Sequence, residues 1–217
     1  MKIVMKLSVL ILLMATATSA LAWFFWIKPK EKTAPVKAGS HKTTGDDPST
    51  ILRLKQKALL AADFVRENNF NTTRCFLVDM RLASGKERFF VYNLKNDMVE
   101  NAGLVAHGSG SDKGGDELCF SNTPNSNCTS LGRYKIGKSY MGTFGLAYKL
   151  HGLDNTNSRA FERFVVLHAH SCVPGADVYP SEICQSWGCP TVSPAFLSVL
   201  KTYIDKSAQP ILLWIYY

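Results

Sequence analysis

One short stretch constrains the fold of this chain more than any other, Gln185-Ser186-Trp187-Gly188-Cys189-Pro190-Thr191-Val192-Ser193-Pro194. Gly188 permits backbone dihedrals and close approaches that a side chain would block. Pro190 fixes its own φ and restricts Cys189 to extended geometry. Ser193 and Pro194 have the pattern of a helix start, an N-cap residue followed by proline. The sequence therefore predicts a stiff turn that presents the Cys189 thiol just upstream of a helix.

A strand-like run that ends in histidines precedes this turn, Arg163-Phe164-Val165-Val166-Leu167-His168-Ala169-His170. Its β-branched and aromatic residues predict a buried strand. A histidine at the end of that strand can face a thiol on the following loop, although His168 and Cys189 are 21 positions apart. A nearby imidazole promotes the thiolate, which is the nucleophilic form of cysteine. We therefore predict Cys189 as a nucleophile and His168 as its base, with His170 as the alternative base.

These residues resemble the catalytic motif of the murein L,D-transpeptidases with a YkuD-like domain. In that family a histidine at a strand end is followed by a loop and then by Ser/Thr-His-Gly-Cys. This chain has His168 and then Ser186-Trp187-Gly188-Cys189, which is similar to a divergent Ser-Trp-Gly-Cys-Pro branch. The resemblance covers roughly residues 71–217. Four more stretches fit that branch in the same order: His107-Gly108-Ser109-Gly110, Phe120-Ser121-Asn122, Ser130-Leu131-Gly132 and Asn157-Ser158-Arg159-Ala160.

Three positions depart from the family pattern. Trp187 replaces the usual histidine before the glycine, and Thr191 stands where many relatives carry arginine or asparagine. In relatives these two positions line the acyl-donor side, so the departures concern the substrate. Ala169 replaces the glycine or serine that commonly follows the histidine, which matters little if only its backbone carbonyl is used.

The resemblance implies a reaction in two halves that needs no cofactor and no metal. The Cys189 thiolate attacks an amide carbonyl, expels an amine and leaves a thioester, and a second amine then takes the acyl group. His168 moves the proton, the carbonyl of Ala169 orients its ring, and an amide at Gly188 or Cys189 stabilises the oxyanion. The implied substrate is the stem peptide of peptidoglycan. The acceptor stays open between another stem peptide, a protein amine, a free D-amino acid and water, and water would make the protein an L,D-carboxypeptidase.

Five other residues are candidates for contact with the substrate. Ser186 either supports the turn or touches the substrate, and Trp187 packs beside the thiol or walls the substrate groove. His170 follows His168 on the same strand side. His107 lies in a Gly/Ser loop that either lines the cleft or forms an ordinary turn. Arg159 is the weakest candidate, and a structural role is the simpler explanation for it.

Two other classes of protein fit parts of the same sequence. The residues around the turn include ligand types suitable for zinc, although their spacing matches no zinc-finger pattern well: His168, His170, Cys172, Cys184 and Cys189. A catalytically silent, membrane-tethered protein that binds the cell wall is the other alternative, and it would not need the Cys–His pair. Metal analysis alongside labelling by a carbapenem β-lactam separates both alternatives from a transpeptidase.

The N-terminal part of the chain differs from the rest in charge and hydropathy. Of the net charge of +8, residues 1–57 contribute +7, with ten Lys/Arg against three Asp/Glu. The near-neutral remainder argues against a nucleic-acid-binding domain. Residues 1–27 include an uncharged run of 21 residues from Leu7 to Ile27, long enough to span a bilayer. They are either a membrane anchor or a signal peptide cleaved near Ala20-Leu21-Ala22.

The leader and the segment after it predict where the protein works. Residues 28–48 are rich in Lys, Pro, Gly, Thr and Asp and predict a basic flexible linker. We expect an exported, periplasmic domain. It would be tethered to the inner membrane by residues 1–27, or secreted if the leader is cleaved.

The remaining residues predict a mainly β fold, and the resemblance implies a YkuD-like sandwich or barrel-like sheet with one or two packed helices over residues 71–217. Residues 49–70 predict an amphipathic helix, capped by Ser49-Thr50, with an apolar stripe of Leu52, Leu59, Leu60, Phe64 and Val65. Apolar runs predict strands over residues 76–80, 88–94, 98–106, 145–150, 163–168 and 211–216, with a hairpin turn at 83–86. Residues 107–132 lack periodicity and predict a long loop, which is either functional or tied down.

Six cysteines in an exported domain predict disulfide bonds. If Cys189 stays free, the other five allow two local pairs, Cys119 with Cys128 and Cys172 with Cys184, and leave Cys75 as a buried strand residue. The sequence leaves this connectivity open. A bond between Cys184 and Cys189 is the competing arrangement, and it would silence the enzyme.

Overall fold

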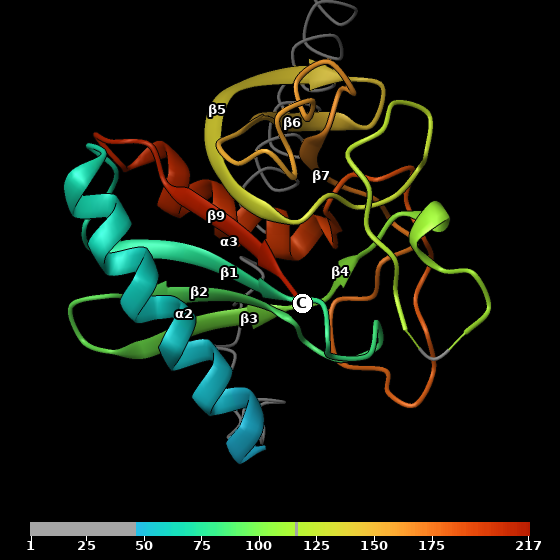
Figure 1. Ribbon diagram of the computed structural model, residues 1–217, viewed down its shortest axis with the longest axis horizontal. Coiled ribbons are helices and arrows are strands. Elements are labelled where there is room, and N and C mark those ends of the chain that lie inside the picture. Colours follow the sequence, from blue (N-terminus) through green and yellow to red (C-terminus); the bar gives the residue numbers. More distant parts are fainter. Residues whose placement is uncertain (1–46, 116) are drawn as a thin grey trace, which may run out of the picture. The chain divides into compact units, whose positions relative to one another are not determined.

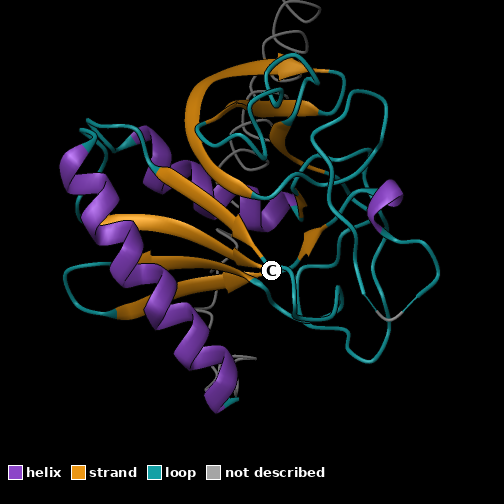
Figure 2. Ribbon diagram, in the orientation of Figure 1, coloured by secondary structure: helices purple, strands orange, loops and turns teal. Residues whose placement is uncertain are grey.

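The computed structural model describes residues 47–115 and 117–217 (Figure 1). The leader predicted over residues 1–27 and the linker up to residue 46 lie outside this part. No helix within the described ranges is long and apolar enough to cross a membrane. The described chain is mainly β, as predicted, with a strongly curved sheet and the helices α2 and α3 (Figure 2).

One sheet of nine strands forms the body of the described part. Its strands are β1 Arg74–Asp79, β2 Phe89–Asn93, β3 Met98–Gly103, β4 Val105–Ala106, β5 Gly132–Gly142, β6 Gly145–Gly152, β7 Val166–Ala169, β8 Thr191–Val192 and β9 Leu212–Tyr216. Their order in space is β3-β2-β1-β9-β5-β6-β7-β8-β4. Because β3 and β4 follow each other in the chain but lie at opposite ends of this order, the sheet curls into a nearly closed barrel.

The strand predictions are confirmed for most of the sheet but not for all of it. The β1–β2 hairpin forms as expected, with Leu77 opposite Phe90. The single strand predicted over 98–106 is wrong, because β3 pairs with β2 whereas β4 pairs with β8. The strand predicted from Arg163 begins only at Val166, since Phe164 has a φ of +56° that interrupts the extended chain. Strands β5 and β8 were not predicted.

Helix α2, Pro48–Glu67, begins and ends earlier than the helix predicted over residues 49–70. Its N-cap is Asp47, not Ser49 or Thr50, because the Asp47 carboxylate accepts the Thr50 N–H at 3.3 Å. Proline in the first turn lacks only a donor that would have no partner within the helix.

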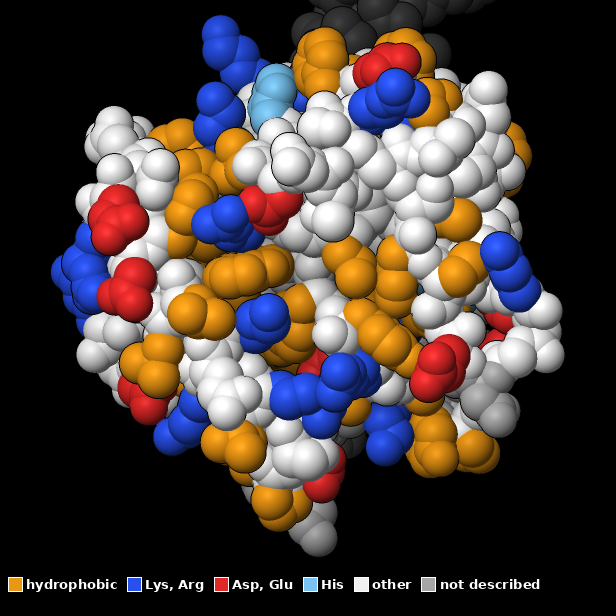
Figure 3. Space-filling view, viewed as in Figure 1, with side chains coloured by type: hydrophobic (Ala, Val, Ile, Leu, Met, Phe, Trp, Pro, Cys, Tyr) orange, Lys and Arg blue, Asp and Glu red, His pale blue; other side chains and the backbone are white. Residues whose placement is uncertain are grey.

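The apolar stripe predicted for α2 is wrong at three positions. Leu52, Leu59 and Leu60 are 59%, 69% and 55% exposed. The residues that face the sheet are Thr50, Leu54, Ala58, Ala61 and Val65. Two alanines on this face let the helix approach the sheet closely. On the face of the molecule seen in Figure 3, apolar side chains lie open between basic and acidic ones.

The two helices pack against opposite faces of the same strands. On β1, Leu77 belongs to the cluster beneath α2, while the neighbouring Val78 belongs to the larger core that contains α3. Helix α3, Pro194–Asp205, begins as predicted, with the Ser193 hydroxyl accepting the Phe196 N–H at 3.1 Å. The Phe196 ring packs edge-on against Phe89 of β2. The residues just upstream of α3 are therefore anchored to the core.

One of the two expected disulfides is present. Cys172 and Cys184 are bonded, which closes the loop between β7 and the cysteine turn. The pairing of Cys119 with Cys128 is wrong, because both are free thiols that donate to nearby backbone carbonyl oxygens. Cys75 is free and fully buried on β1, as expected.

Candidate active site

The turn before Cys189 requires glycine. Gly188 has a φ of +108°, which L side chains rarely adopt, and a Cβ there would lie 2.8 Å from the Cys128 carbonyl oxygen. The Ser186 hydroxyl closes the turn by donating to the Cys189 carbonyl oxygen at 2.7 Å and accepting the Gly188 N–H at 3.1 Å. Ser186 thus supports the turn.

The same turn is fixed to the loop that follows β4. The Ser186 N–H donates to the His107 carbonyl oxygen at 2.8 Å, and the Ser109 N–H donates to the Ser186 carbonyl oxygen at 2.7 Å. These two bonds tie a segment near residue 107 to one near residue 186. The backbone of His107, rather than its imidazole, therefore helps to place the turn.

The Cys189 thiol is half-buried against the segment that leads into β7. Its Sγ accepts the Val166 N–H at 3.4 Å and lies 3.7 Å from the Phe164 carbonyl oxygen. Burial raises the pKa of Cys189, while the Val166 amide and the Arg163 guanidinium act to lower that pKa. A thiolate here has one amide donor and one nearby cation to stabilise it.

His168 lies on β7, where its Cα pairs with that of Thr191 on the parallel strand β8. Its Nδ1 is 3.1 Å from the Ala169 carbonyl oxygen, which can only accept, so Nδ1 carries the proton. Nε2 is then the acceptor, 2.9 Å from the Thr191 hydroxyl. Burial lowers the pKa of His168, the Ala169 carbonyl raises it and the neighbouring His170 lowers it. The net effect is a lowered pKa, which favours the neutral imidazole.

Cys189 and His168 border one cavity of about 430 Å³. The residues around it are Ala106, Phe144, His168, His170, Cys172, Cys184, Gln185, Ser186, Trp187, Cys189 and Thr191. Within the described ranges no hydrogen bond joins the thiol to the imidazole, because Nε2 is bonded to Thr191. Phe144 stacks on the His168 ring, with centroids 5.1 Å apart. Trp187, 81% exposed, stands at the same cavity.

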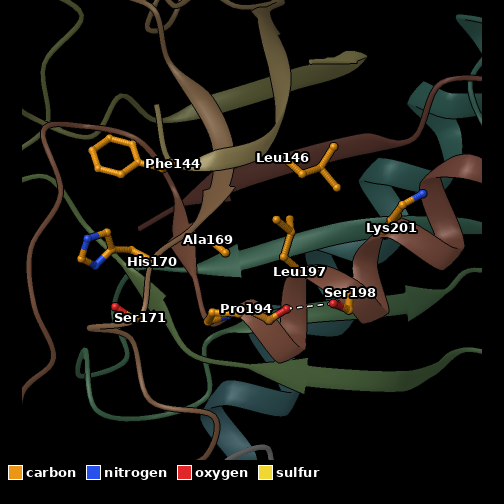
Figure 4. A pocket seen from close by; sticks show the side chains of 9 residues that line it. All are labelled: Phe144, Leu146, Ala169, His170, Ser171, Pro194, Leu197, Ser198 and Lys201. Carbon is orange, nitrogen blue, oxygen red and sulfur yellow. Dashed lines mark hydrogen bonds between the residues drawn. The ribbon is translucent and has the colours of Figure 1, made fainter. Parts of the chain in front are cut away.

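A second cavity of about 330 Å³ continues beyond His170 (Figure 4). The two cavities share Phe144 and His170. Figure 4 shows Leu146 and Leu197 facing this space, with Lys201 at its far side. The apolar groove beside the thiol is therefore longer than the cavity that holds the thiol itself.

Two predicted site residues lie away from the thiol cavity. The His107 side chain is 5% exposed and lines a different cavity of about 350 Å³, with Nδ1 2.9 Å from a nitrogen of Arg88. Burial, followed by the charge of Arg88, lowers the pKa of His107 to about 4. Arg159 is exposed and donates its N–H to the Asn122 side chain at 3.2 Å. The structure brings neither side chain to the sulfur.

The two amides considered for the oxyanion differ in their availability. The Gly188 N–H donates to the Ser186 hydroxyl at 3.1 Å. The Cys189 N–H has no hydrogen-bond acceptor in the part of the chain that the structure describes. Of the two, the amide of Cys189 is the one left to act on a ligand.

Three residues that complete this site were not predicted as its members. Thr191 was noted only as a departure from the family pattern, yet its hydroxyl holds Nε2 of His168. Phe144 follows the end of β5, a strand that was not predicted. Arg163 was treated as the start of a strand. The disulfide also removes Cys172 and Cys184 as thiolate ligands for the zinc alternative.

Comparison with known proteins places the chain in a family. The model of the L,D-transpeptidase catalytic domain matches residues 48–216. Among curated proteins no sequence matches the chain. The L,D-transpeptidase of Xylanimonas cellulosilytica is a similar solved structure, with 14% identity over 71% of this chain and 68% of that chain and a TM-score of 0.37.

Two further solved structures are similar at the same distant level. Bd1075 of Bdellovibrio bacteriovorus has 17% identity over 66% of this chain and 48% of that chain, with a TM-score of 0.41. The helical cell shape determining protein Pgp2 of Campylobacter jejuni has 9% identity over 74% of this chain and 54% of that chain, with a TM-score of 0.41. This chain thus spans about half the length of these two. The match over residues 48–216 covers most of the chain, which therefore belongs to the L,D-transpeptidase catalytic domain family.

Proposed function

We propose that the protein is a cysteine-dependent L,D-transpeptidase that acts on peptidoglycan stem peptides through a thioester acyl-enzyme, in cell-wall cross-linking or remodelling. The observation that carries this proposal is that the Cys189 thiol and the His168 imidazole, oriented by the Ala169 carbonyl, border one cavity. Family membership supports the reaction class. A nucleophile and an oriented base are what acyl transfer requires.

In the first half-reaction, Sγ of Cys189 attacks the carbonyl carbon of a donor amide while its proton passes to Nε2 of His168. Nδ1 cannot take this proton, because it donates its own to the Ala169 carbonyl oxygen. The Thr191 hydroxyl releases Nε2 by turning towards the Cys189 carbonyl oxygen, which lies 3.4 Å away. The Cys189 N–H then stabilises the oxyanion. Collapse of the tetrahedral intermediate expels the amine, which leaves with the proton from Nε2.

In the second half-reaction, an acceptor amine attacks the thioester carbonyl and gives its proton to Nε2. The sulfur leaves as thiolate and recovers the proton from His168, so that the enzyme returns to its starting state. The two connected cavities offer room for a donor and an acceptor peptide on either side of Phe144 and His170. Trp187 and Phe144 would contact the peptide backbones and their apolar side chains.

We further propose that the domain works in the periplasm, tethered to the inner membrane by residues 1–27. The disulfide between Cys172 and Cys184 supports an oxidising compartment, because such bonds persist outside the reducing cytosol. The uncharged run from Leu7 to Ile27 supports the tether.

A direct test of the chemistry is the intact mass of the protein after incubation with a carbapenem. Opening of the β-lactam ring by the thiol adds the mass of one whole drug molecule per protein. We expect this adduct on the wild type and on Cys119→Ala, which removes another free cysteine, but not on Cys189→Ala. An unlabelled wild type, or an adduct that survives Cys189→Ala, would contradict the proposal.

A further inference from the structure

Arg163 is a half-buried cation beside the cysteine turn whose hydrogen bonds all go to uncharged oxygens. Its acceptors are the carbonyl oxygens of Ser121 and Cys128, at 2.9 and 2.6 Å, and the hydroxyls of Ser130 and Ser126, at 3.2 and 3.4 Å. No ion pair joins Arg163 to a carboxylate in the described part of the chain. Its charge is therefore not neutralised by a partner.

The segment that begins with Arg163 contacts the sulfur of Cys189 through its backbone. A Cβ added to Gly188 would lie 3.3 Å from Nη2 of Arg163, so the guanidinium lies close to the residue directly before the cysteine. Three residues after Arg163, the Val166 N–H donates to Sγ at 3.4 Å. The positive φ of Phe164 bends the chain between these two contacts. One short segment thus brings both a cation and an amide donor towards the sulfur.

The other ionisable groups near the thiol do not supply a fixed positive charge. Burial lowers the pKa of His168 and favours its neutral form, although the bond from Nδ1 to the Ala169 carbonyl acts in the opposite direction. His170 borders the same cavity, with Nδ1 accepting a backbone N–H at 3.2 Å. Tyr134 is buried, which raises its pKa to about 12 and keeps its phenol uncharged. Among these groups only Arg163 is a permanent cation.

We propose that Arg163 is a positioning residue that supplies the counter-charge for the Cys189 thiolate, leaving His168 to act as a neutral base rather than as half of an ion pair. The inference rests on the proposed role of Cys189 as nucleophile. It separates two tasks that the pairing of cysteine with histidine would otherwise combine. Arg163 stabilises the charge on the sulfur, and His168 moves the proton.

The test is the pH dependence of Cys189 alkylation by iodoacetamide, measured by mass spectrometry of the peptide that contains Cys189. An opposite charge within about 4–6 Å shifts a pKa by about 1–3 units, and we expect Arg163→Gln to raise the midpoint of alkylation by about one unit. The thiolate fraction then falls about tenfold at low pH. The more basic thiolate is also about threefold more nucleophilic, which offsets part of this loss in the alkylation rate. Arg163→Lys keeps the charge and should leave the midpoint close to that of the wild type.

Two further variants separate charge from structure. Arg159→Gln removes an exposed arginine four positions earlier and should not move the midpoint. Ser126→Asp places a carboxylate beside the intact guanidinium, and it should raise the midpoint even if Arg163→Gln does not fold. Equal shifts in Arg163→Gln and Arg163→Lys, or an unchanged midpoint in Ser126→Asp, would overturn the inference. Because alkylation needs no turnover, these shifts in a protein without transpeptidase activity would refute the proposed function and still show that Arg163 stabilises the Cys189 thiolate.

Discussion

Substitution of Gly188 by alanine should destabilise the protein by distorting the turn that holds Cys189. A non-glycine residue at a φ of +108° is strained by about 1–3 kcal/mol. The new methyl group would also lie 2.8 Å from the Cys128 carbonyl oxygen. That oxygen cannot retreat freely, because Arg163 binds it at 2.6 Å. Such overpacking adds about 1–3 kcal/mol.

Alanine also lowers the conformational entropy of the unfolded chain, which stabilises the folded protein by about 0.4–1 kcal/mol. We therefore expect the free energy of unfolding to fall by about 2–4 kcal/mol. For a domain of this size the loss corresponds to a decrease in Tm of roughly 4–16 °C. Thermal unfolding followed by circular dichroism measures this decrease. The rate of Cys189 alkylation should change in the same variant, since the turn places the sulfur.

Two other glycines serve as matched controls. Gly114 has a φ of +75° with nothing within 4 Å of an added Cβ, so Gly114→Ala tests backbone strain alone. Gly175 has an ordinary φ and the same open surroundings, so Gly175→Ala should be close to neutral. The expected order of destabilisation is Gly188, then Gly114, then Gly175. A Gly188→Ala protein as stable as Gly175→Ala would refute the reasoning.

Three more outcomes are expected. His168→Ala should lower transpeptidation by about 10²–10⁴-fold and far more than His170→Ala, and the reverse ranking would make His170 the base. Reduction of the Cys172–Cys184 bond should lower activity without unfolding the sheet. A disulfide that closes a loop of this length contributes about 2–4 kcal/mol of stability, and this one acts on a single loop. Unchanged activity in reductant would show that the loop does not need the disulfide. The free energy of unfolding should fall by about 3 kcal/mol as the pH is lowered from 6.5 to 4. In this range His107 becomes protonated in the unfolded chain but stays largely neutral in the folded protein, where its pKa is about 4. His107→Gln should flatten this slope, and an equally steep slope in that variant would count against the buried neutral imidazole.

The elements that the sequence predicted well are those whose signals are local. The β1–β2 hairpin follows from two apolar runs around a turn, and the start of α3 follows from Ser193 and Pro194. Strand β8 has only two residues, and it exists because it pairs with both β7 and β4. No local pattern could have indicated it. On β5, Tyr134 is buried between the less buried Arg133 and Lys135, an alternation that was overlooked in a stretch rich in glycine and lysine.

For the candidate site, too, the sequence predicted the residues of a local motif but not the contacts that depend on the fold. Cys189 and His168 could be proposed from the motif, and the structure places them on one cavity, while their catalytic roles stay predictions. The contact between Thr191 and His168 depends on the parallel register of β7 and β8. The stacking of Phe144 on His168 depends on where the turn between β5 and β6 ends up in space. Such contacts arise from tertiary structure, and they cannot be predicted from the type of either residue.

The measurement that tests the central claim most directly is mass analysis of the products after incubation of the purified protein with a mixture of muropeptides that differ in stem length. We expect cross-linked dimers whose mass equals two monomers less one released terminal amine, and we expect none with Cys189→Ala. Monomers shortened by one residue, with no dimers, would show that water is the acceptor and that the protein is an L,D-carboxypeptidase. Muropeptides left unchanged by a folded wild-type protein, or dimers formed equally by Cys189→Ala, would contradict the account.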